Sequence, residues 1–323
     1  MPPEYPLISV ILPVYNAERY VREAVESILR QTYQTLELIA LIAVDDDSTD
    51  SSFEILEELA AADDRLRLFT RPSKACTQAL NLGIDLARGD WIARMDADDI
   101  AFPQRFEEQL RYLQNHESVV AVGSSVILID GDGDEIGEQL VNGNPQEIAD
   151  SILLGMGGLM HPTVMMRTEA LKQVGGYREK FQGAEDQDLW LRLNEIGEVT
   201  NIPDPLLYYR VHQANFSFQN HERCLDQLRA AIEDAYRRRG IAGPVRLGRI
   251  PPPTSAWERR LAWAWSAINT SRRRTALKYA IEMIRERPAC RNGWVVACHA
   301  IGGKHAEWLH RLLTNRYTMR GPK

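Results

Sequence analysis

Residues 89–99, GDWIARMDADD, combine a short apolar run with a cluster of carboxylates. Trp91 to Met95 predict a buried strand, and three aspartates follow directly at its carboxyl end: Asp96, Asp98 and Asp99. Carboxylate oxygens in an Asp-x-Asp pattern suit Mg²⁺ or Mn²⁺. Acidic turns are common in proteins, so the motif gains its weight from its position after an apolar strand.

The chain before this stretch alternates between expected strands and expected helices. Apolar runs at 7–14, 36–44 and 66–69 predict three strands, and helical spacing recurs between them, beginning after an expected cap at Asn16. Such alternation predicts a parallel sheet with helices on both faces, in which ligands bind beyond the carboxyl ends of the strands. The second strand also ends in acids, because residues 45–47 are all aspartate.

The chain after this stretch predicts a mixed β region followed by helices. Residues 119–140 indicate a hairpin whose tip, DGDGDE, imitates the start of a calcium loop but has neither the glycine at loop position 6 nor the glutamate at position 12. A solvated tip is therefore expected. Residues 222–239 and 255–316 indicate helices, joined by a link containing Gly240 and Pro253.

Several chemistries are excluded by what the sequence lacks. No GxGxxG follows the first strand and no GxxxxGK[ST] occurs, which argues against hydride transfer and against a P-loop nucleotidase. HExxH and GxSxG are also missing, and the four cysteines form no CxxC pair. The N-terminus has no basic and apolar leader, and no apolar run approaches the ~20 residues of a membrane span, so a cytoplasmic protein is expected.

The charge of the chain is unevenly distributed. The formal net charge is -7, but residues 237–323 carry 19 Lys and Arg against four Asp and Glu. Such a basic region can meet nucleic acid or an anionic membrane surface. It shows no nucleic-acid motif, and the acidic body would repel a nucleic-acid backbone, so we expect no nucleic acid and favour the inner face of the cell membrane. In the alternative, these arginines pair with the acidic body.

A second acidic cluster lies at residues 185–188. Glu185, Asp186 and Asp188 follow Gly183 and precede Trp190. Acids in a first helical turn favour the helix dipole, which explains part of the cluster. The dipole does not explain three acids beside a tryptophan, so a structural and a functional role can both hold.

An ordered set of motifs now resembles the inverting, nucleotide-sugar-dependent glycosyltransferases of family 2, which have the GT-A fold. The resemblance covers residues 7 to about 217 and rests on SVILPVYN (9–16), VDDDSTD (44–50), ALNLGI (79–84), GDWIARMDADD (89–99), HPTVMMR (161–167), GGY (175–177), AEDQDLWLRL (184–193) and YYRVH (208–212). The match to the family rests on the order and spacing of these motifs. It implies an α/β GT-A fold, Rossmann-like with a mostly parallel mixed sheet, followed by an α-helical C-terminal extension.

The resemblance also implies roles for individual residues. Tyr15 matches an aromatic residue near the base, Asp45 or Asp46 the acid that reads the base edge, and Asp96 the acid near the ribose. Asp98 matches the metal-binding acid, with Asp96 beside it. Asp186 matches the general base, with Glu185 adjacent, and His212 the histidine that holds the metal or diphosphate. Lys74 lies where it could approach the donor. The family pattern has glycine where this chain has Asp47, and its glycine near 75–76 is replaced by Ala75-Cys76.

These roles imply a metal-dependent inverting glycosyltransferase, a hexosyltransferase by type, with Mn²⁺ or Mg²⁺ as cofactor. The donor would be a nucleotide diphosphate sugar, with UDP-sugar as the default, and the acceptor a hydroxyl of a polysaccharide or lipid-linked glycan. The expected domains are 1–221, catalytic, with a nucleotide-sugar half (7–110) and an acceptor half (111–221), and 222–323, a basic helical region. The alternatives are an inactive sugar-nucleotide-binding or scaffold protein and, less favoured, a nucleic-acid-binding protein.

Overall fold

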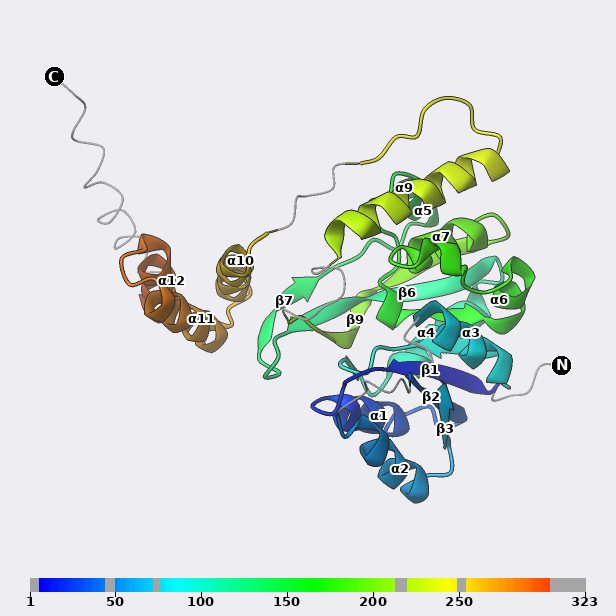
Figure 1. Ribbon diagram of the computed structural model, residues 1–323, viewed down its shortest axis with the longest axis horizontal. Coiled ribbons are helices and arrows are strands. Elements are labelled where there is room, and N and C mark those ends of the chain that lie inside the picture. Colours follow the sequence, from blue (N-terminus) through cyan, green and yellow to red (C-terminus); the bar gives the residue numbers. More distant parts are fainter. Residues whose placement is uncertain (1–5, 44–49, 72–75, 213–219, 249–253, 303–323) are drawn as a thin grey trace. The chain divides into compact units, whose positions relative to one another are not determined.

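A computed structural model describes residues 6–43, 50–71, 76–212, 220–248 and 254–302 of the 323-residue chain. The chain forms two compact units, and Figure 1 shows the course of each. The first consists of Met1–Val126, Leu140–Tyr209 and Ala214–Pro251. The second consists of Ile127–Gln139, Arg210–Gln213 and Pro252–Lys323.

The first half of the first unit is the expected strand–helix alternation. Strand β1 (Ile8–Val14) pairs in parallel with β2 (Leu36–Ala43) and β4 (Trp91–Arg94), and β2 pairs in parallel with β3 (Leu66–Arg71). Helices α1 (Val21–Leu29) and α2 (Ser52–Ala62) lie on one side of these strands, and α3 (Cys76–Leu86) on the other (Figure 1). The expected cap at Asn16 is wrong: α1 begins after Tyr20, and Asn16 has a φ of 47°.

The sheet becomes mixed directly beside β4. Strand β8 (Met165–Arg167) is antiparallel to both β4 and β6 (Val119–Ile129), and β5 (Ile100–Ala101) is antiparallel to β9 (Glu198–Arg210). The strand order is β3-β2-β1-β4-β8-β6-β9-β5, and β7 (Glu135–Gln139) pairs with β6. Strand β4 is therefore central, and the aspartates that follow it lie at the middle of the sheet edge, where ligands of such sheets bind.

Three further α-helices of the first unit are packed against α7 (Glu185–Leu193). This helix contacts α5 (Pro145–Leu153), α6 (Thr168–Val174) and α9 (His221–Arg238), while α4 (Arg105–Asn115) contacts β8. Short helices η1 (His161–Thr163) and η2 (Glu179–Phe181) complete this half. Helix α9 falls within the expected basic helical region 222–323, but it lies in the first unit, where Ala231, Ile232 and Ala235 are buried in the same core as Leu191.

The second unit joins the β6–β7 hairpin to helices α10 (Ala256–Asn269), α11 (Arg273–Glu286) and α12 (Arg291–Gly302). The hairpin tip is solvated at Asp132 and Asp134, whose side chains are 61% and 51% exposed, but it is also paired. The Nζ atom of Lys278 lies 2.7 Å from a carboxylate oxygen of each tip aspartate, Asp130, Asp132 and Asp134. Tyr279 also donates a hydrogen bond to Asp130 at 2.9 Å. The ammonium has three N–H groups, so one lysine satisfies all three acids.

No helix within the described ranges is both long and apolar enough to cross a membrane.

Candidate active site

Three aspartates gather at the carboxyl end of β4. Asp96, Asp98 and Asp99 each present a carboxylate oxygen, and the three oxygens lie within 4.8 Å of one another. Asp96 and Asp98 are partly exposed, whereas Asp99 is buried. The short strand ends at Arg94, and the chain then turns into β5, with the Asp99 amide 3.4 Å from the Asp96 carbonyl oxygen. This turn keeps the three carboxylates together in one small region, where hard oxygen ligands could hold a divalent cation.

A buried arginine supports the first of these acids. Arg94 Nη1 donates to Asp96 Oδ2 at 2.8 Å, and Arg94 Nη2 lies 2.5 Å from Asp96 Oδ1. The Arg94 side chain is only 7% exposed. Burial raises the pKa of Asp96, and so does the nearby charge of Asp98, while Arg94 opposes the shift. Arg94 therefore offsets part of the electrostatic cost of placing several acids together.

The second acidic cluster lies in the first turn of α7. Glu185 Oε2 accepts the Gly183 N–H at 2.5 Å, and Asp186 Oδ1 accepts the Gln187 N–H at 2.7 Å. Gly183 has a φ of 103°, a conformation that favours glycine. Burial raises the pKa of both acids, and Arg94 lowers it in each case. Glu185 and Asp186 thus interact favourably with the helix dipole at the start of α7 and also belong to the candidate site.

The two acidic clusters lie close in space although they are about 90 residues apart in sequence. The charge of Asp186 contributes to the raised pKa of Asp96, and Arg94 acts on the pKa of both. Contacts join the two elements directly: the ring of His161 meets that of Trp190 on α7 at 5.8 Å, and the Val164 carbonyl oxygen, three residues after His161, accepts the Arg94 N–H at 3.0 Å. The structure therefore brings Asp96 and Asp186, both singled out from the sequence, into one site. The roles given to them by the resemblance stay predictions.

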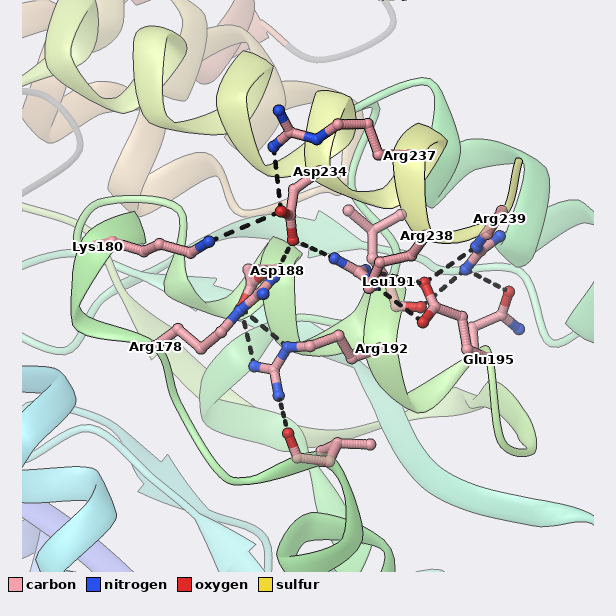
Figure 2. A network of polar contacts seen from close by, with 12 residues as sticks. Arg178, Lys180, Asp188, Leu191, Arg192, Glu195, Asp234, Arg237, Arg238 and Arg239 are labelled. Atoms are coloured by element: carbon pink, nitrogen blue, oxygen red, sulfur yellow. Dashed lines mark hydrogen bonds and ion pairs between the residues drawn. The ribbon is translucent and has the colours of Figure 1, made fainter. Parts of the chain in front are cut away.

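A network of ion pairs anchors the helix that carries Asp186 (Figure 2). Asp188, fully buried on α7, accepts hydrogen bonds from Arg178 Nε at 3.0 Å and from Arg192 Nη2 at 2.8 Å. Arg178 Nη2 also donates to Asp234 on α9 at 2.7 Å. Arg238, the last residue of α9, and Arg239, which follows it, reach Glu195 just beyond the end of α7. Helix α9 is thereby joined to both ends of α7.

A cluster of aromatic and polar side chains surrounds Arg94. His161 Nε2 lies 2.8 Å from the Tyr177 hydroxyl, and the His161 ring meets the Trp190 ring edge-on at 5.8 Å between centroids. Burial, and then the charge of Arg94, lowers the pKa of His161 well below its usual value, so its imidazole is neutral near pH 7. Burial raises the pKa of Cys76 to about 12, which makes it an inert thiol and agrees with a packing role.

The other expected site residues divide into three groups. Tyr15 follows β1 and is 48% exposed, as a residue that stacks on a base would need to be. His212 follows β9 and belongs to the second unit, so its expected role at the metal stays a prediction. The expected donor-binding residues Asp45, Asp46 and Lys74 lie outside the described residues.

Two residues near the aspartates had no role in the sequence analysis. Tyr209 follows Tyr208, which pairs with Ile100 directly after the aspartates, and burial, with further contributions from Asp99, Asp96 and Asp98, raises the pKa of its hydroxyl. Arg94 is the other. A charged residue inside the apolar run WIARM is the signal that could have identified it, because a buried charge needs a partner.

Comparisons with known proteins agree with this arrangement. Residues 9–175 match the family model described as glycosyl transferase family 2. An uncharacterised glycosyltransferase of Haemophilus influenzae is 33% identical over 229 residues, which are 68% of this chain and 70% of that protein. The O-antigen biosynthesis glycosyltransferase WbnJ of Escherichia coli is 36% identical over 212 residues, 64% of this chain and 80% of that protein.

A solved structure supports the fold independently. The mannosyltransferase PcManGT of Pyrobaculum calidifontis, in complex with GDP-Man and Mn²⁺, superposes with a TM-score of 0.56 at 18% identity. The superposition covers 99% of this chain and 90% of that one. The expected GT-A fold, a mixed α/β sheet followed by C-terminal helices, is confirmed.

Proposed function

The chain belongs to glycosyl transferase family 2 and is a glycosyltransferase, and from that premise we propose that it moves a sugar from a nucleotide diphosphate sugar to an acceptor hydroxyl with inversion. The observation that carries the proposal is the group of three aspartates at the end of the central strand β4, whose carboxylate oxygens lie within 4.8 Å of one another. Inversion needs one displacement on the anomeric carbon and no covalent enzyme intermediate. A base and a leaving-group site on opposite sides of that carbon are then sufficient.

The residues at the end of β4 fit a divalent cation, Mn²⁺ or Mg²⁺. The fit rests on the chemistry of the donor set, since three carboxylate oxygens within 4.8 Å are hard ligands that such cations prefer. Asp98 would be the principal ligand, with Asp96 and Asp99 beside it and His212 as a further candidate from the resemblance. When bound, the cation would neutralise charge on the departing diphosphate.

Asp186 would act as the general base. Its carboxylate lies in the first turn of α7, held by the Gln187 N–H and by the anchoring of the helix. It would take the proton of the acceptor hydroxyl as that oxygen attacks. Glu185 stands beside it, and its hydrogen bond from Gly183 suits a residue that shapes the turn. We therefore give Glu185 the supporting role.

The donor nucleotide would lie at the carboxyl ends of β1, β2 and β4. Tyr15 would stack on the base, Asp45 or Asp46 would read its edge, Asp96 would accept from the ribose, and Lys74 would approach the phosphates. UDP-sugar is the default donor, but the structural neighbour binds GDP-Man, so both nucleotides belong in a test. The acceptor would be a hydroxyl of a polysaccharide or lipid-linked glycan, a proposal supported by the O-antigen name of the Escherichia coli relative.

The first experiment identifies the donor. The full chain is incubated with Mn²⁺ and a panel of GDP-, UDP- and other nucleotide sugars, and nucleotide release is measured with candidate glycan acceptors. Release above that of the Asp98→Ala variant supports the proposal. If nucleotide binds but no donor is turned over with any acceptor, the inactive sugar-nucleotide-binding protein becomes the better hypothesis.

The second experiment tests the base. Asp186→Asn keeps the shape of the side chain and removes its basicity, so turnover should fall at least ~10²-fold with donor binding nearly unchanged. Asp85→Asn, at an exposed position of α3, is the matched control. If Glu185→Gln is the crippling change and Asp186→Asn is mild, the two roles are exchanged.

We propose that the helical part of the second unit binds an anionic membrane surface, and the side chains exposed on it support this. Trp294 is 52% exposed and Ile301 71% exposed on α12, while Arg273, Arg274 and Arg291 are exposed nearby in sequence. Each basic residue near an anionic leaflet contributes about 1 kcal/mol, and apolar side chains add insertion. Attachment at the inner face of the cell membrane would place the enzyme beside a lipid-linked acceptor.

Flotation with anionic vesicles tests this attachment. The full chain should float at low salt, and Trp294→Ser together with Ile301→Ser should reduce the bound fraction several-fold. Because the Debye length is about 10 Å at 0.1 M, binding should also weaken as salt rises. A chain that ignores anionic vesicles at low salt would show that these side chains serve another purpose.

A further inference from the structure

Four motifs of the sequence meet around the buried side chain of Tyr177. Asn81, on α3, binds the backbone of Tyr177 twice: its Nδ2 donates to the carbonyl oxygen and its Oδ1 accepts the N–H, each at 2.8 Å. A Cβ atom at Gly176 would lie 2.6 Å from Asn81 Oδ1, so this contact needs a glycine there. The motifs ALNLGI and GGY, which have no role in the proposed function, are therefore two sides of one contact.

The Tyr177 hydroxyl extends this contact to a third motif, HPTVMMR, at the first residue of that motif. His161 Nε2 lies 2.8 Å from the hydroxyl oxygen, and the centroids of the two rings are 5.5 Å apart. A neutral imidazole nitrogen can donate or accept such a bond. The histidine thus satisfies the hydroxyl of a tyrosine that is only 4% exposed.

His161 belongs to a turn that two other elements hold in place. It begins η1, and the carbonyl oxygen of Thr163 at the end of η1 accepts a hydrogen bond from Gln109 of α4 at 2.6 Å. The next carbonyl oxygen, that of Val164, accepts the N–H of Arg94 in β4 at 3.0 Å. The imidazole is therefore placed by a backbone that is bonded to both α4 and β4.

The fourth motif lies on α7, where Trp190 meets the ring of His161. The centroids of these rings are 5.8 Å apart and their planes are at 83°. Among the described residues the buried indole N–H of Trp190 has no hydrogen-bond partner, so ring packing orients it. Asp186 comes four residues before Trp190, and side chains at that spacing lie on the same face of a helix. The face of α7 that carries Asp186 is thus the face that packs against His161.

We propose that His161 and Tyr177 are positioning residues that fix the orientation of Asp186 relative to the nucleotide-sugar half of the chain. This inference rests on the proposed function, in which Asp186 is the general base. Asn81 holds the tyrosine from the nucleotide-sugar half, and Trp190 receives the histidine on the helix of the base. Because a misplacement of about 1 Å can cost ~10²-fold in rate, this link should act on turnover and not on nucleotide affinity.

The test removes the hydrogen bond between the two residues from either side. Tyr177→Phe deletes only the hydroxyl, and His161→Phe keeps a ring against Trp190 but offers the hydroxyl no polar atom. Initial rates are measured with the GDP- or UDP-sugar that the donor panel identifies, and binding of GDP or UDP is measured by calorimetry with Mn²⁺. In both variants kcat should fall about 10-fold, while the donor KM and the dissociation constant of the nucleoside diphosphate stay within about twofold.

The double variant separates positioning from stability. Each single substitution leaves a buried polar atom without its partner and should lower the melting temperature, whereas Tyr177→Phe with His161→Phe removes both atoms and should restore most of it. The value of kcat should stay low in the double variant. A merely structural role predicts instead that kcat recovers together with the melting temperature.

The indole resonance of Trp190 reports on the contact without any turnover. It is assigned as the ¹H–¹⁵N signal that is lost in Trp190→Phe. Tyr177→Phe should shift this signal, because the hydroxyl orients the imidazole that the indole packs against. The matched control is a second tyrosine–histidine ring pair, Tyr112 and His116 at the end of α4, with centroids 4.1 Å apart. Tyr112→Phe should change neither the indole signal nor kcat.

Three results would overturn the inference. The value of kcat could be unchanged in both single variants, it could recover in the double variant, or the Trp190 signal could stay in place in Tyr177→Phe. If His161→Phe does not fold, the rate and the indole signal of Tyr177→Phe still decide the question. A wild type that turns over no donor defeats the proposed function as well, whereas an active wild type with equally active variants defeats this inference only.

Discussion

The network between α7 and α9 makes a quantitative prediction for Asp234→Asn. Asp234 is only 14% exposed and accepts hydrogen bonds from Arg178 and Arg238 (Figure 2). Burial alone would raise its pKa, but the hydrogen bond and charge of Arg178, with help from Arg237 and Arg238, lower the pKa from 3.8 to about 2. The ionised form is thus favoured in the folded protein.

The magnitude follows from the linkage between protonation and folding. A pKa lowered from 3.8 to about 2 contributes roughly 2 kcal/mol to the free energy of unfolding at neutral pH. Because the folded pKa is the lower one, this contribution is complete above the unfolded value and is lost as pH falls from about 4 towards 2. At pH 3 about half of it should remain. The substitution also leaves Arg178 with one acid fewer, so a total loss of about 2–3 kcal/mol is expected at pH 7.

Urea denaturation followed by circular dichroism measures this effect. Asp234→Asn is compared with Glu233→Gln, which neutralises an exposed acid at the adjacent position of α9 and should change the free energy of unfolding by less than about 0.5 kcal/mol. The difference between the two variants should shrink by about half when the pH is lowered to 3. Equal stabilities at pH 7, or a difference that does not depend on pH, would refute the reasoning.

Three further predictions concern the acids of the site, the hairpin and the sheet. Burial raises the pKa of Asp186, so turnover should fall on the acid side at a pH above the usual aspartate range, and a rate profile that is flat down to pH 4 would contradict this. Lys278→Met leaves three carboxylates facing one another and should lower the free energy of unfolding by about 2–3 kcal/mol, with partial recovery when Asp132→Asn is added. In Gly89→Ala the new Cβ would lie 2.5 Å from the Leu7 carbonyl oxygen, so a loss of about 1–3 kcal/mol is expected in thermal unfolding, and an unchanged melting temperature would show that β1 adapts.

The parallel half of the fold could be predicted because its signals are local. Each strand of that half is an apolar run of a few residues, and each helix between them has apolar residues at helical spacing. The alternation of strands and helices can therefore be recognised in the sequence without knowledge of any long-range contact. Asp96 and Asp98 could be placed for the same reason, since the end of a strand fixes the edge of the sheet. The backbone conformation of Asn16, where a helix cap was expected, could not be predicted. Its left-handed backbone follows from the course of the loop after β1.

The antiparallel half gave weaker signals. Strand β8 has only three residues, too few for a period to appear, yet it separates β4 from β6 and makes the sheet mixed. The contact of Lys278 with the hairpin joins residues more than 140 positions apart. Isolated aspartates and a lone lysine carry no pattern that pairs them, so the tip at residues 130–135 was expected to be solvated.

The same reasoning explains which parts of the site the sequence could reveal. Acids that meet a ligand occur in clusters at element ends, and such clusters stand out: Asp96 to Asp99 after β4, and Glu185 to Asp188 at the start of α7. The cations that hold these acids are single residues: Arg94, which is buried, and Arg178, which is partly exposed but pairs with the fully buried Asp188. A buried carboxylate without such a partner would be protonated or would destabilise the fold. The arginines are therefore as necessary to the site as the acids. A charge inside an apolar run marks Arg94 in the sequence, but only the folded chain identifies the partner of each arginine, because partners are chosen by packing and not by spacing.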